Sequence, residues 1–252
     1  MNPITTVIFD WAGTTVDYGC VAPVNAFVSA FESAGFHPTI DEVRAPMGMQ
    51  KRAHIETMLE GQPHTSEDVD RIYDHFESSL FEVLQDHADP IPGVLDTVEV
   101  LRTKGFQIGS TTGYTAAMME VVAPLAAKNG YSPDLLICPD DVGGIGRPQP
   151  YMLWENLRRL GVMSIDQVIK IGDTSSDIRE GNNAGCVSVG VLVGSSMIGL
   201  TESEFAALSP KEVDRVLEVA RTRYHQAGAD YILYQISDLP DLIESINEER
   251  GA

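Results

Sequence analysis

Six short apolar runs, separated by stretches of helical periodicity, constrain the fold of this chain more than any other feature of its sequence. The first run is TTVIF, residues 5–9, which is rich in β-branched residues and is followed by a glycine-containing turn. The other five begin at Phe106, Asp134, Gln167, Cys186 and Asp230. Strands that alternate with helices need crossover connections, which produce a parallel sheet covered on both faces. We therefore predict an α/β fold with a doubly wound parallel sheet.

The segment between the first two runs has a different pattern, because it contains helical periodicity without a convincing strand. The i, i+3, i+4, i+7 spacing of one helical face occurs at Val24, Phe27, Val28 and Phe31. Further along, Thr39 and Glu42 have the spacing of a helix capping box. We predict a core domain made of residues 1–19 and 91–252, with a helical cap domain of residues 20–90 inserted into it.

The charge balance of the chain limits its partners. The 252 residues include 17 Lys and Arg against 37 Asp and Glu, which gives a formal net charge of −20. Nucleic acids and anionic membranes need clustered positive charge, so we expect neither as a partner. The N-terminal residues lack the pattern of a signal peptide, and no apolar run is long enough to span a bilayer, so we expect a cytoplasmic protein.

Residues that can carry chemistry lie just beyond several of the predicted strands. Asp10 follows the first run directly, and the later runs lead into TTGY, GRPQP and GDTSSD, which begin at Thr111, Gly146 and Gly172. In open parallel sheets, ligands bind beyond the carboxyl ends of the strands. We therefore expect these four segments to meet at one edge of the sheet.

This set of residue types suits phosphoryl transfer. A carboxylate such as Asp10 can attack phosphorus and form an acyl phosphate. Asp10 and Asp173 offer oxygen ligands for Mg²⁺. Thr112 and the backbone N–H groups of the turn at Gly113 would hold the phosphoryl oxygens, while Arg147 would neutralise their charge. Each residue alone has a plainer interpretation, as a helix cap or a surface charge, so the prediction depends on their combination.

The order Asp10, Thr112, Arg147, Asp173 and Asp177 resembles the haloacid dehalogenase superfamily over essentially the whole chain. The resemblance implies an aspartyl-phosphate intermediate, Mg²⁺, and a helical cap inserted after the first strand, with Asp177 supporting the metal site from behind. Phosphatases of this superfamily usually have an aspartate general acid two residues after the nucleophile, where this chain has Ala12. General acid catalysis is worth about a hundred- to ten-thousand-fold, so we expect a poor phosphatase.

Cleavage of a P–C bond does not need that acid, because an imine beside the carbon accepts the electrons as an enamine. Such a mechanism requires a lysine at the site. The segment PMGMQKRAHIETML offers Lys51 close to a Pro-Gly break, with His54 three residues further on the same helical face. The plainer alternative is a solvated lysine on a helix surface.

Four segments, FDWAGTTVDYG, PMGMQKRAHIETML, GSTTGYT and GRPQP, resemble the phosphonoacetaldehyde hydrolase family. The resemblance implies that Lys51 forms a Schiff base, that Asp10 is the nucleophile and that His54 relays protons during imine formation. It also implies that Ala12 offers its backbone carbonyl to Mg²⁺ and that the substrate pocket is lined by Met47, Cys20 and Tyr114. From the residues alone, Met47 and Cys20 could equally be core residues.

The resulting hypothesis is hydrolysis of phosphonoacetaldehyde to acetaldehyde and phosphate, through a Schiff base at Lys51 and an aspartyl phosphate at Asp10. A phosphatase or phosphomutase of the same superfamily, acting on a small phosphate monoester, is the main alternative and would not need Lys51. A catalytically silent binding module is a further alternative. The resemblance implies a family that dimerises through its caps. The apolar face of residues 24–31 is also larger than one contact with the core domain needs, so we expect a homodimer.

An Ala12→Asp variant tests whether the alanine is tied to the leaving group. We expect it to lower kcat/KM for phosphonoacetaldehyde, because the new carboxylate crowds the aldehyde carbon and favours the protonated, non-nucleophilic form of Lys51. The same change should raise the slow hydrolysis of a small phosphate monoester, since a general acid then stands beside the leaving oxygen. Steady-state kinetics of both enzymes on both substrates measures the two effects. Unchanged phosphonoacetaldehyde turnover would show that Ala12 is incidental.

Overall fold

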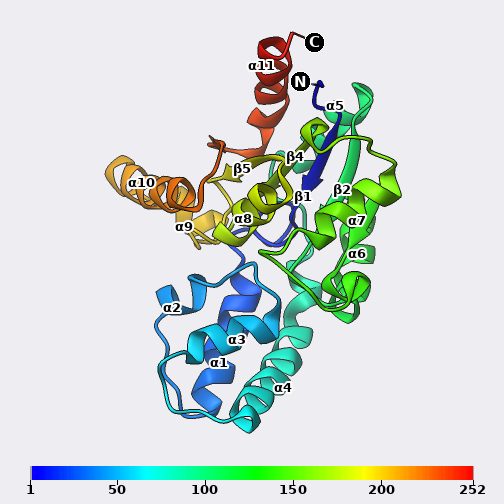
Figure 1. The fold of residues 1–252 in the computed structure, drawn as a ribbon. Coiled ribbons are helices and arrows are strands. Elements are labelled where there is room, and N and C mark those ends of the chain that lie inside the picture. Colours follow the sequence, from blue (N-terminus) through cyan, green and yellow to red (C-terminus); the bar gives the residue numbers. More distant parts are fainter. Residues whose placement is uncertain (1, 252) are drawn as a thin grey trace.

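A six-stranded, all-parallel sheet forms the centre of the computed structural model, which describes residues 2–251 (Figure 1). The strand order is β3-β2-β1-β4-β5-β6. The strands are β1 (Thr6–Phe9), β2 (Gln107–Thr111), β3 (Leu135–Ile137), β4 (Val168–Gly172), β5 (Val187–Val191) and β6 (Tyr231–Leu233). Each of the six apolar runs forms one strand. The predicted α/β fold with a parallel sheet is therefore confirmed.

Helices cover both faces of this sheet, as the alternation of strands and helices requires. They are α5 (Val94–Thr103), α6 (Ala116–Lys128), α7 (Tyr151–Leu160), α8 (Ser175–Ala184), α9 (Glu202–Ala206), α10 (Pro210–Ala227) and α11 (Leu239–Glu249). Side chains of β1 alternate between the faces. Val7 and Phe9 join the larger core with α5, α6 and α11, whereas Ile8 packs with Leu153 of α7. All of these side chains are fully buried.

Four further helices lie together beyond the carboxyl ends of the strands (Figure 1). They are α1 (Val21–Ser33), α2 (Ile40–Arg44), α3 (Lys51–Leu59) and α4 (Ser66–Val83). The capping box predicted at Thr39 and Glu42 opens α2. These helices fill most of the segment predicted as the cap, and the division of the chain into two domains stays a prediction.

The apolar face of α1 packs inside the chain. Phe27 stacks on Phe76 of α4 with ring centroids 4.0 Å apart, and Val24 and Phe31 are also buried. Val28 is half-buried against the same core. The sequence analysis expected a surplus of apolar surface here for a second contact. That expectation is wrong, because α3 and α4 already cover this face.

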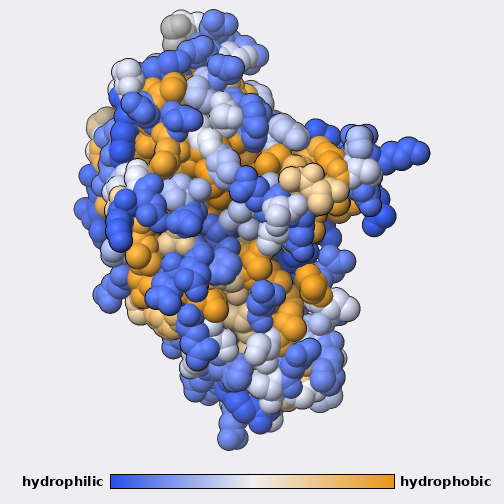
Figure 2. Space-filling view, turned by 180° about the vertical axis from the view of Figure 1, so that it is seen from behind, coloured by the Kyte–Doolittle hydropathy of each residue, from blue (hydrophilic) through white to orange (hydrophobic). Residues whose placement is uncertain are grey.

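The outer surface is mixed in character. Figure 2 shows hydrophobic residues scattered among hydrophilic ones on the face opposite to that of Figure 1. The large hydrophobic side chains with substantial exposure include Ile145, Tyr151, Trp154 and Met163. Among residues 2–251, no helix combines the length and the apolar character that crossing a bilayer demands.

The two chain segments that join helices α1–α4 to the sheet are held against each other. The backbone N–H of Ile91 donates to the carbonyl of Thr15, with 2.9 Å between the two atoms. Closer to the helices, His87 Nδ1 at the end of the short 3₁₀ helix η1 (Leu84–His87) lies 2.9 Å from Asp17 Oδ1. Asp17 is buried and has a left-handed backbone, with φ of 54°. This hydrogen bond raises the pKa of His87 above its usual value of 6.5.

A His87→Asn variant tests this link, because asparagine keeps a donor and loses the charge. Since the pKa of His87 is higher in the folded state, protonation favours folding. The contribution of the pair should be complete below the unfolded pKa of about 6.5 and lost as pH rises through the raised folded value. Urea unfolding of both proteins at a series of pH values measures the difference in free energy of unfolding. Asp17→Asn should remove the same pH dependence, and a difference that does not change with pH would contradict the assignment.

Candidate active site

Strand register brings the predicted site residues to the same edge of the sheet. Phe9 of β1 pairs with Ser110 of β2 on one side and with Ile171 of β4 on the other. Asp10 follows at the end of β1, and its backbone N–H donates to the Ile171 carbonyl at 3.0 Å. Because the strands are parallel, the residues just after β1, β2 and β4 all lie at this carboxyl edge.

A small enclosed pocket lies at this edge and includes residues from the sheet and from the helical segment. It is lined by Asp10, Ala12, Cys20, Met47, Gly48, Lys51, Thr112, Gly113, Tyr114, Arg147, Asp173 and Thr174. The free space is about 20 Å³, which is room for about one water molecule. Ten of the twelve residues proposed for the site from the sequence thus share one pocket, and the other two, His54 and Asp177, lie behind it.

The pocket is closed by the segment between α2 and α3. A side chain at Gly113 would come within 3.0 Å of the Met49 carbonyl oxygen. Gly48, with φ of 85°, lies so close to Thr174 that any side chain there would collide with the Thr174 hydroxyl. Gly48 is thus fixed by the Thr174 side chain and by its own positive φ, whereas a side chain at Gly113 would force a small shift of the Met49 carbonyl. This close approach leaves too little free space in the pocket for a ligand much larger than water.

Lys51 is the first residue of α3 and points into this pocket. It is 3% exposed, and its Nζ lies 5.0 Å from the centre of the Tyr114 ring and 5.7 Å from that of Phe27. Burial lowers the pKa of Lys51, and the nearby positive charge of Arg147 acts in the same direction. The carboxylates of Asp10 and Asp173 oppose the shift. The net effect favours the neutral amine, which is the nucleophilic form.

His54 lies behind Lys51, one turn further along α3. Its ring stacks on Phe27, with 3.9 Å between the ring centroids, and it is completely buried. Burial and the nearby Lys51 hold the pKa of His54 well below its usual range. Neither ring nitrogen has a well-formed hydrogen bond among the described residues, although the backbone of Val43 is close enough to oppose the lowering of the pKa. A neutral imidazole next to an amine is able to accept and return a proton.

Arg147 lies against the proposed nucleophile. Its Nη1 donates to Asp10 Oδ1 at 2.6 Å and lies 3.0 Å from Asp177 Oδ1. The residue is 3% exposed, which rejects the alternative of a surface charge. Nearby, the Thr112 hydroxyl accepts a hydrogen bond from the backbone N–H of Tyr114 at 3.0 Å, which shapes the turn that contains Gly113.

The carboxylates of this site fit a divalent cation. Oxygen atoms of Asp10, Asp173 and Asp177 all lie within 4.8 Å of one another. Asp173 Oδ2 accepts the backbone N–H of Ser196 at 2.7 Å, while its buried Oδ1 has no partner among the described residues. Burial and the neighbouring carboxylates raise the pKa of Asp173 well above its usual value. A bound cation would satisfy the free oxygen and relieve that repulsion.

The roles of the remaining pocket residues are set by burial. Burial, followed by the charge of Asp17, raises the pKa values of both the Cys20 thiol and the Tyr114 hydroxyl, so both groups stay protonated. Met47 is 3% exposed and belongs to the core as well as to the pocket wall. From the sequence, Met47 and Cys20 could be either core residues or pocket residues. In the structure, each of them belongs to both the core and the pocket wall.

No role was predicted from the sequence for three buried residues behind Arg147, namely Thr111, Lys170 and Glu180. Lys170 Nζ lies 2.8 Å from Asp177 Oδ1, and Glu180 Oε2 accepts from Arg147 Nε at 2.9 Å. A signal for Lys170 was present in the sequence, because a lysine inside the apolar run VIKIG must be buried and therefore paired. Glu180 lies three residues after Asp177, on the same face of α8.

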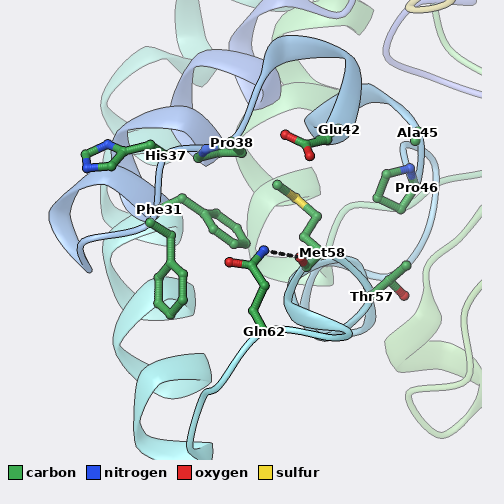
Figure 3. Close-up of a pocket in the computed structure, with 10 residues that line it drawn as sticks. Phe31, His37, Pro38, Glu42, Ala45, Pro46, Thr57, Met58 and Gln62 are labelled. Carbon is green, nitrogen blue, oxygen red and sulfur yellow. Dashed lines mark hydrogen bonds between the residues drawn. The ribbon is translucent and has the colours of Figure 1, made fainter.

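A second hollow, of about 460 Å³, lies among the helices α1–α3 (Figure 3). Its walls include Phe31, Pro38 and Met58, and the Gln62 amide at its rim donates to the Met58 carbonyl at 3.3 Å. Glu42 is one of its charged lining residues, and its carboxylate already accepts hydrogen bonds from Thr39. None of the residues proposed for the site lines this hollow.

Comparison with known proteins identifies the family of the chain. Residues 4–185 match the model of a haloacid dehalogenase-like hydrolase. Phosphonoacetaldehyde hydrolase of Lysinibacillus sphaericus is 50% identical, in a match that covers 98% of this chain and 96% of that protein. This chain belongs to the phosphonoacetaldehyde hydrolase family. The phosphonoacetaldehyde hydrolase of Bacillus cytotoxicus is 44% identical, over 98% of this chain and 97% of that protein.

A solved structure supports the same placement within the phosphonoacetaldehyde hydrolase family. The crystal structure of a phosphonoacetaldehyde hydrolase-like protein from Oleispira antarctica matches with a TM-score of 0.93 and 34% identity. It covers 100% of this chain and 96% of that one. The arrangement of helices α1–α4 and the sheet is therefore shared with that protein, and the chain is a hydrolase.

Binding of Mg²⁺ should stabilise this phosphonoacetaldehyde hydrolase family member. Because the folded protein gathers carboxylates that the unfolded chain does not, we expect the thermal midpoint to rise with Mg²⁺ concentration, by a stabilisation of about 2.7 kcal/mol at one hundred times Kd. Asp173→Asn should lose most of this response, whereas Asp214→Asn, an exposed position on α10, should keep it. Differential scanning calorimetry measures both. A midpoint of the unaltered protein that ignores Mg²⁺ would contradict the metal site.

Proposed function

We propose that this chain hydrolyses the P–C bond of phosphonoacetaldehyde to give acetaldehyde and phosphate. One observation carries the proposal: the Lys51 amine and the Asp10 carboxylate line the same closed pocket, although they come from different parts of the fold. Ala12 lines that pocket as well and offers no acid for a leaving oxygen. The names of the relatives at 44% and 50% identity support the same substrate.

The first half of the proposed reaction takes place on Lys51. The neutral amine, favoured by burial, attacks the aldehyde carbon, and water leaves as the imine forms. The aldehyde oxygen takes up two protons before it leaves as water, one from the amine and one from solvent water. His54 is buried, neutral and one helical turn from Lys51, so we assign this proton transfer to it. The protonated imine is then the electron sink for the next step.

The second half takes place at Asp10. A carboxylate oxygen of Asp10 attacks phosphorus, the P–C bond breaks, and its electron pair moves into the imine to give an enamine and an aspartyl phosphate. Protonation of the enamine carbon and hydrolysis of the imine release acetaldehyde and free Lys51, and water hydrolyses the acyl phosphate. We assign the phosphonyl oxygens to Thr112, to the backbone at Gly113 and to Arg147, which all line the pocket.

Asp10, Asp173 and the backbone carbonyl of Ala12 would hold the divalent cation, which we propose to be Mg²⁺. When bound, such a cation offsets the negative charge of carboxylates and phosphonyl oxygens brought close together. Asp177 contacts Lys170 and Arg147, and its place is therefore behind the ligands.

The proposed assembly is a homodimer formed through helices α1–α4. Its support is the resemblance to the family, since the apolar face of α1 is already covered within the chain. The proposed partner of the site is the small phosphonate alone, because the net charge of −20 disfavours nucleic acid and anionic membrane surfaces.

Borohydride reduction tests the role of Lys51 directly. In the presence of phosphonoacetaldehyde, the reagent should inactivate the protein and leave a two-carbon group on Lys51, because only an imine is reduced to a stable amine. Lys51→Arg should abolish turnover and labelling, since arginine keeps the charge and does not condense with an aldehyde. Peptide mass spectrometry locates the label, and kinetics measures the loss.

The matched control is Lys128→Arg, which changes an exposed lysine at the end of α6 and should leave turnover unchanged. Labelling at another lysine, or full activity of Lys51→Arg, would remove the Schiff-base mechanism. Turnover of phosphate monoesters that does not depend on Lys51 would favour a phosphatase instead.

A further inference from the structure

A polar cluster behind Arg147 has no assigned role in the proposed reaction. It consists of Thr111 at the end of β2, Lys170 in β4 and Glu180 in α8, and all three are completely buried. They do not line the substrate pocket. Burying two charged groups is costly, and a buried ion pair seldom stabilises a fold more than apolar residues would. Their contacts with Arg147 suggest a purpose other than stability.

The contacts fix the guanidinium group of Arg147 along one edge. Its Nε donates to Glu180 Oε2 at 2.9 Å, and its Nη2 donates to the Thr111 hydroxyl at 2.7 Å. The same hydroxyl donates to Glu180 Oε2 at 3.0 Å, which closes a triangle of hydrogen bonds. Because guanidinium is planar and rigid, two anchored nitrogens set the direction of the third. That third nitrogen, Nη1, is the one that faces Asp10.

The cluster also preserves the positive charge of Arg147. Asp177 and Glu180 together would cancel it, because both lie within reach of the guanidinium group. Lys170 Nζ lies 2.8 Å from Asp177 Oδ1 and 3.6 Å from Glu180 Oε2. Two cations thus share these two carboxylates, so they do not cancel the charge that Arg147 presents, through Nη1, to Asp10 and to an anion bound beside it.

We propose that Glu180 and Thr111 are positioning residues, which hold Arg147 so that its Nη1 edge receives the phosphonyl or phosphate oxygens beside Asp10. This inference rests on the proposed function for the identity of the substrate. In this proposal, Glu180 and Thr111 do not contact the substrate themselves. Their replacement should therefore weaken binding of the anion while leaving the imine chemistry at Lys51 intact.

Thr111 offers a matched pair of variants. Thr111→Val keeps the shape of the side chain and removes both hydrogen bonds, whereas Thr111→Ser keeps the hydroxyl. We expect Thr111→Val to weaken inorganic phosphate binding in the presence of Mg²⁺, and to lower kcat/KM, on the order of 10- to 100-fold, the usual effect of losing an orienting partner. Thr111→Ser should have a phosphate affinity and a kcat/KM close to those of the unaltered protein. Isothermal titration with inorganic phosphate and steady-state kinetics measure them.

Glu180→Gln gives a second test, because glutamine can still accept from Arg147 Nε without the charge. It should also weaken phosphate binding, while Glu218→Gln, exposed on α10, should not. Borohydride trapping of acetaldehyde on Lys51 needs no phosphonyl group and should proceed at an unchanged rate in Thr111→Val and Glu180→Gln. A retained rate shows that each variant is folded with an intact pocket.

A double-mutant cycle with Arg147→Lys decides whether these residues act through Arg147. Lysine cannot make the planar contacts, so adding Thr111→Val to Arg147→Lys should have little further effect on phosphate binding. If the effects of the two substitutions on phosphate binding added in full, the proposal would be overturned. It would also be overturned if Thr111→Val bound phosphate as tightly as the unaltered protein or more tightly. If the unaltered protein bound phosphate but did not cleave phosphonoacetaldehyde, the proposed substrate would fail while the positioning role would still be measured.

Discussion

Burial of opposite charges at one edge of the sheet is the constraint on which this site depends. The carboxylates of Asp10, Asp173, Asp177 and Glu180 share this region with the cations Arg147 and Lys170. When all are ionised, two negative charges remain, which matches a divalent cation. Carboxylates are rarely buried unless they are paired or bound to metal. Positions that seem unrelated in the sequence are therefore linked, because each charge is tolerable only while the others are present.

Exclusion of water links this charged edge to the helices α1–α4. The segment around Gly48 and the first turn of α3 cover the carboxyl ends of the strands, and the same closure buries Lys51 and His54. Burial lowers the pKa values of both residues, although the carboxylate of Asp10 opposes the shift at Lys51. A neutral amine and an ionised carboxylate can therefore share one pocket. The chemistry proposed here needs that combination, and neither half of the fold provides it alone.

The periodicity of the sequence was sufficient to predict the strands of the sheet. It was less informative about what the helical surfaces contact. Each of the six apolar runs became a strand, because a buried parallel strand needs apolar side chains on both faces. The pattern of α1 was also correct, but its apolar side chains pack against α4 within the chain. Periodicity shows that a face is apolar, and it does not show what covers that face. The expected surplus for a dimer contact failed for this reason.

The chemical groups that follow the strands could be identified from the sequence, since strand ends and turn residues are local features. The sequence also shows the departure at Ala12, which separates this chain from phosphatases with a second aspartate. Which cation meets which carboxylate became clear from the packed structure alone, where Glu180 anchors Arg147 and Lys170 balances Asp177. The lowered pKa of Lys51 was likewise decided by the closed pocket. Pairing and desolvation depend on distances between residues far apart in the chain, and those distances exist only after the sheet and helices have packed together.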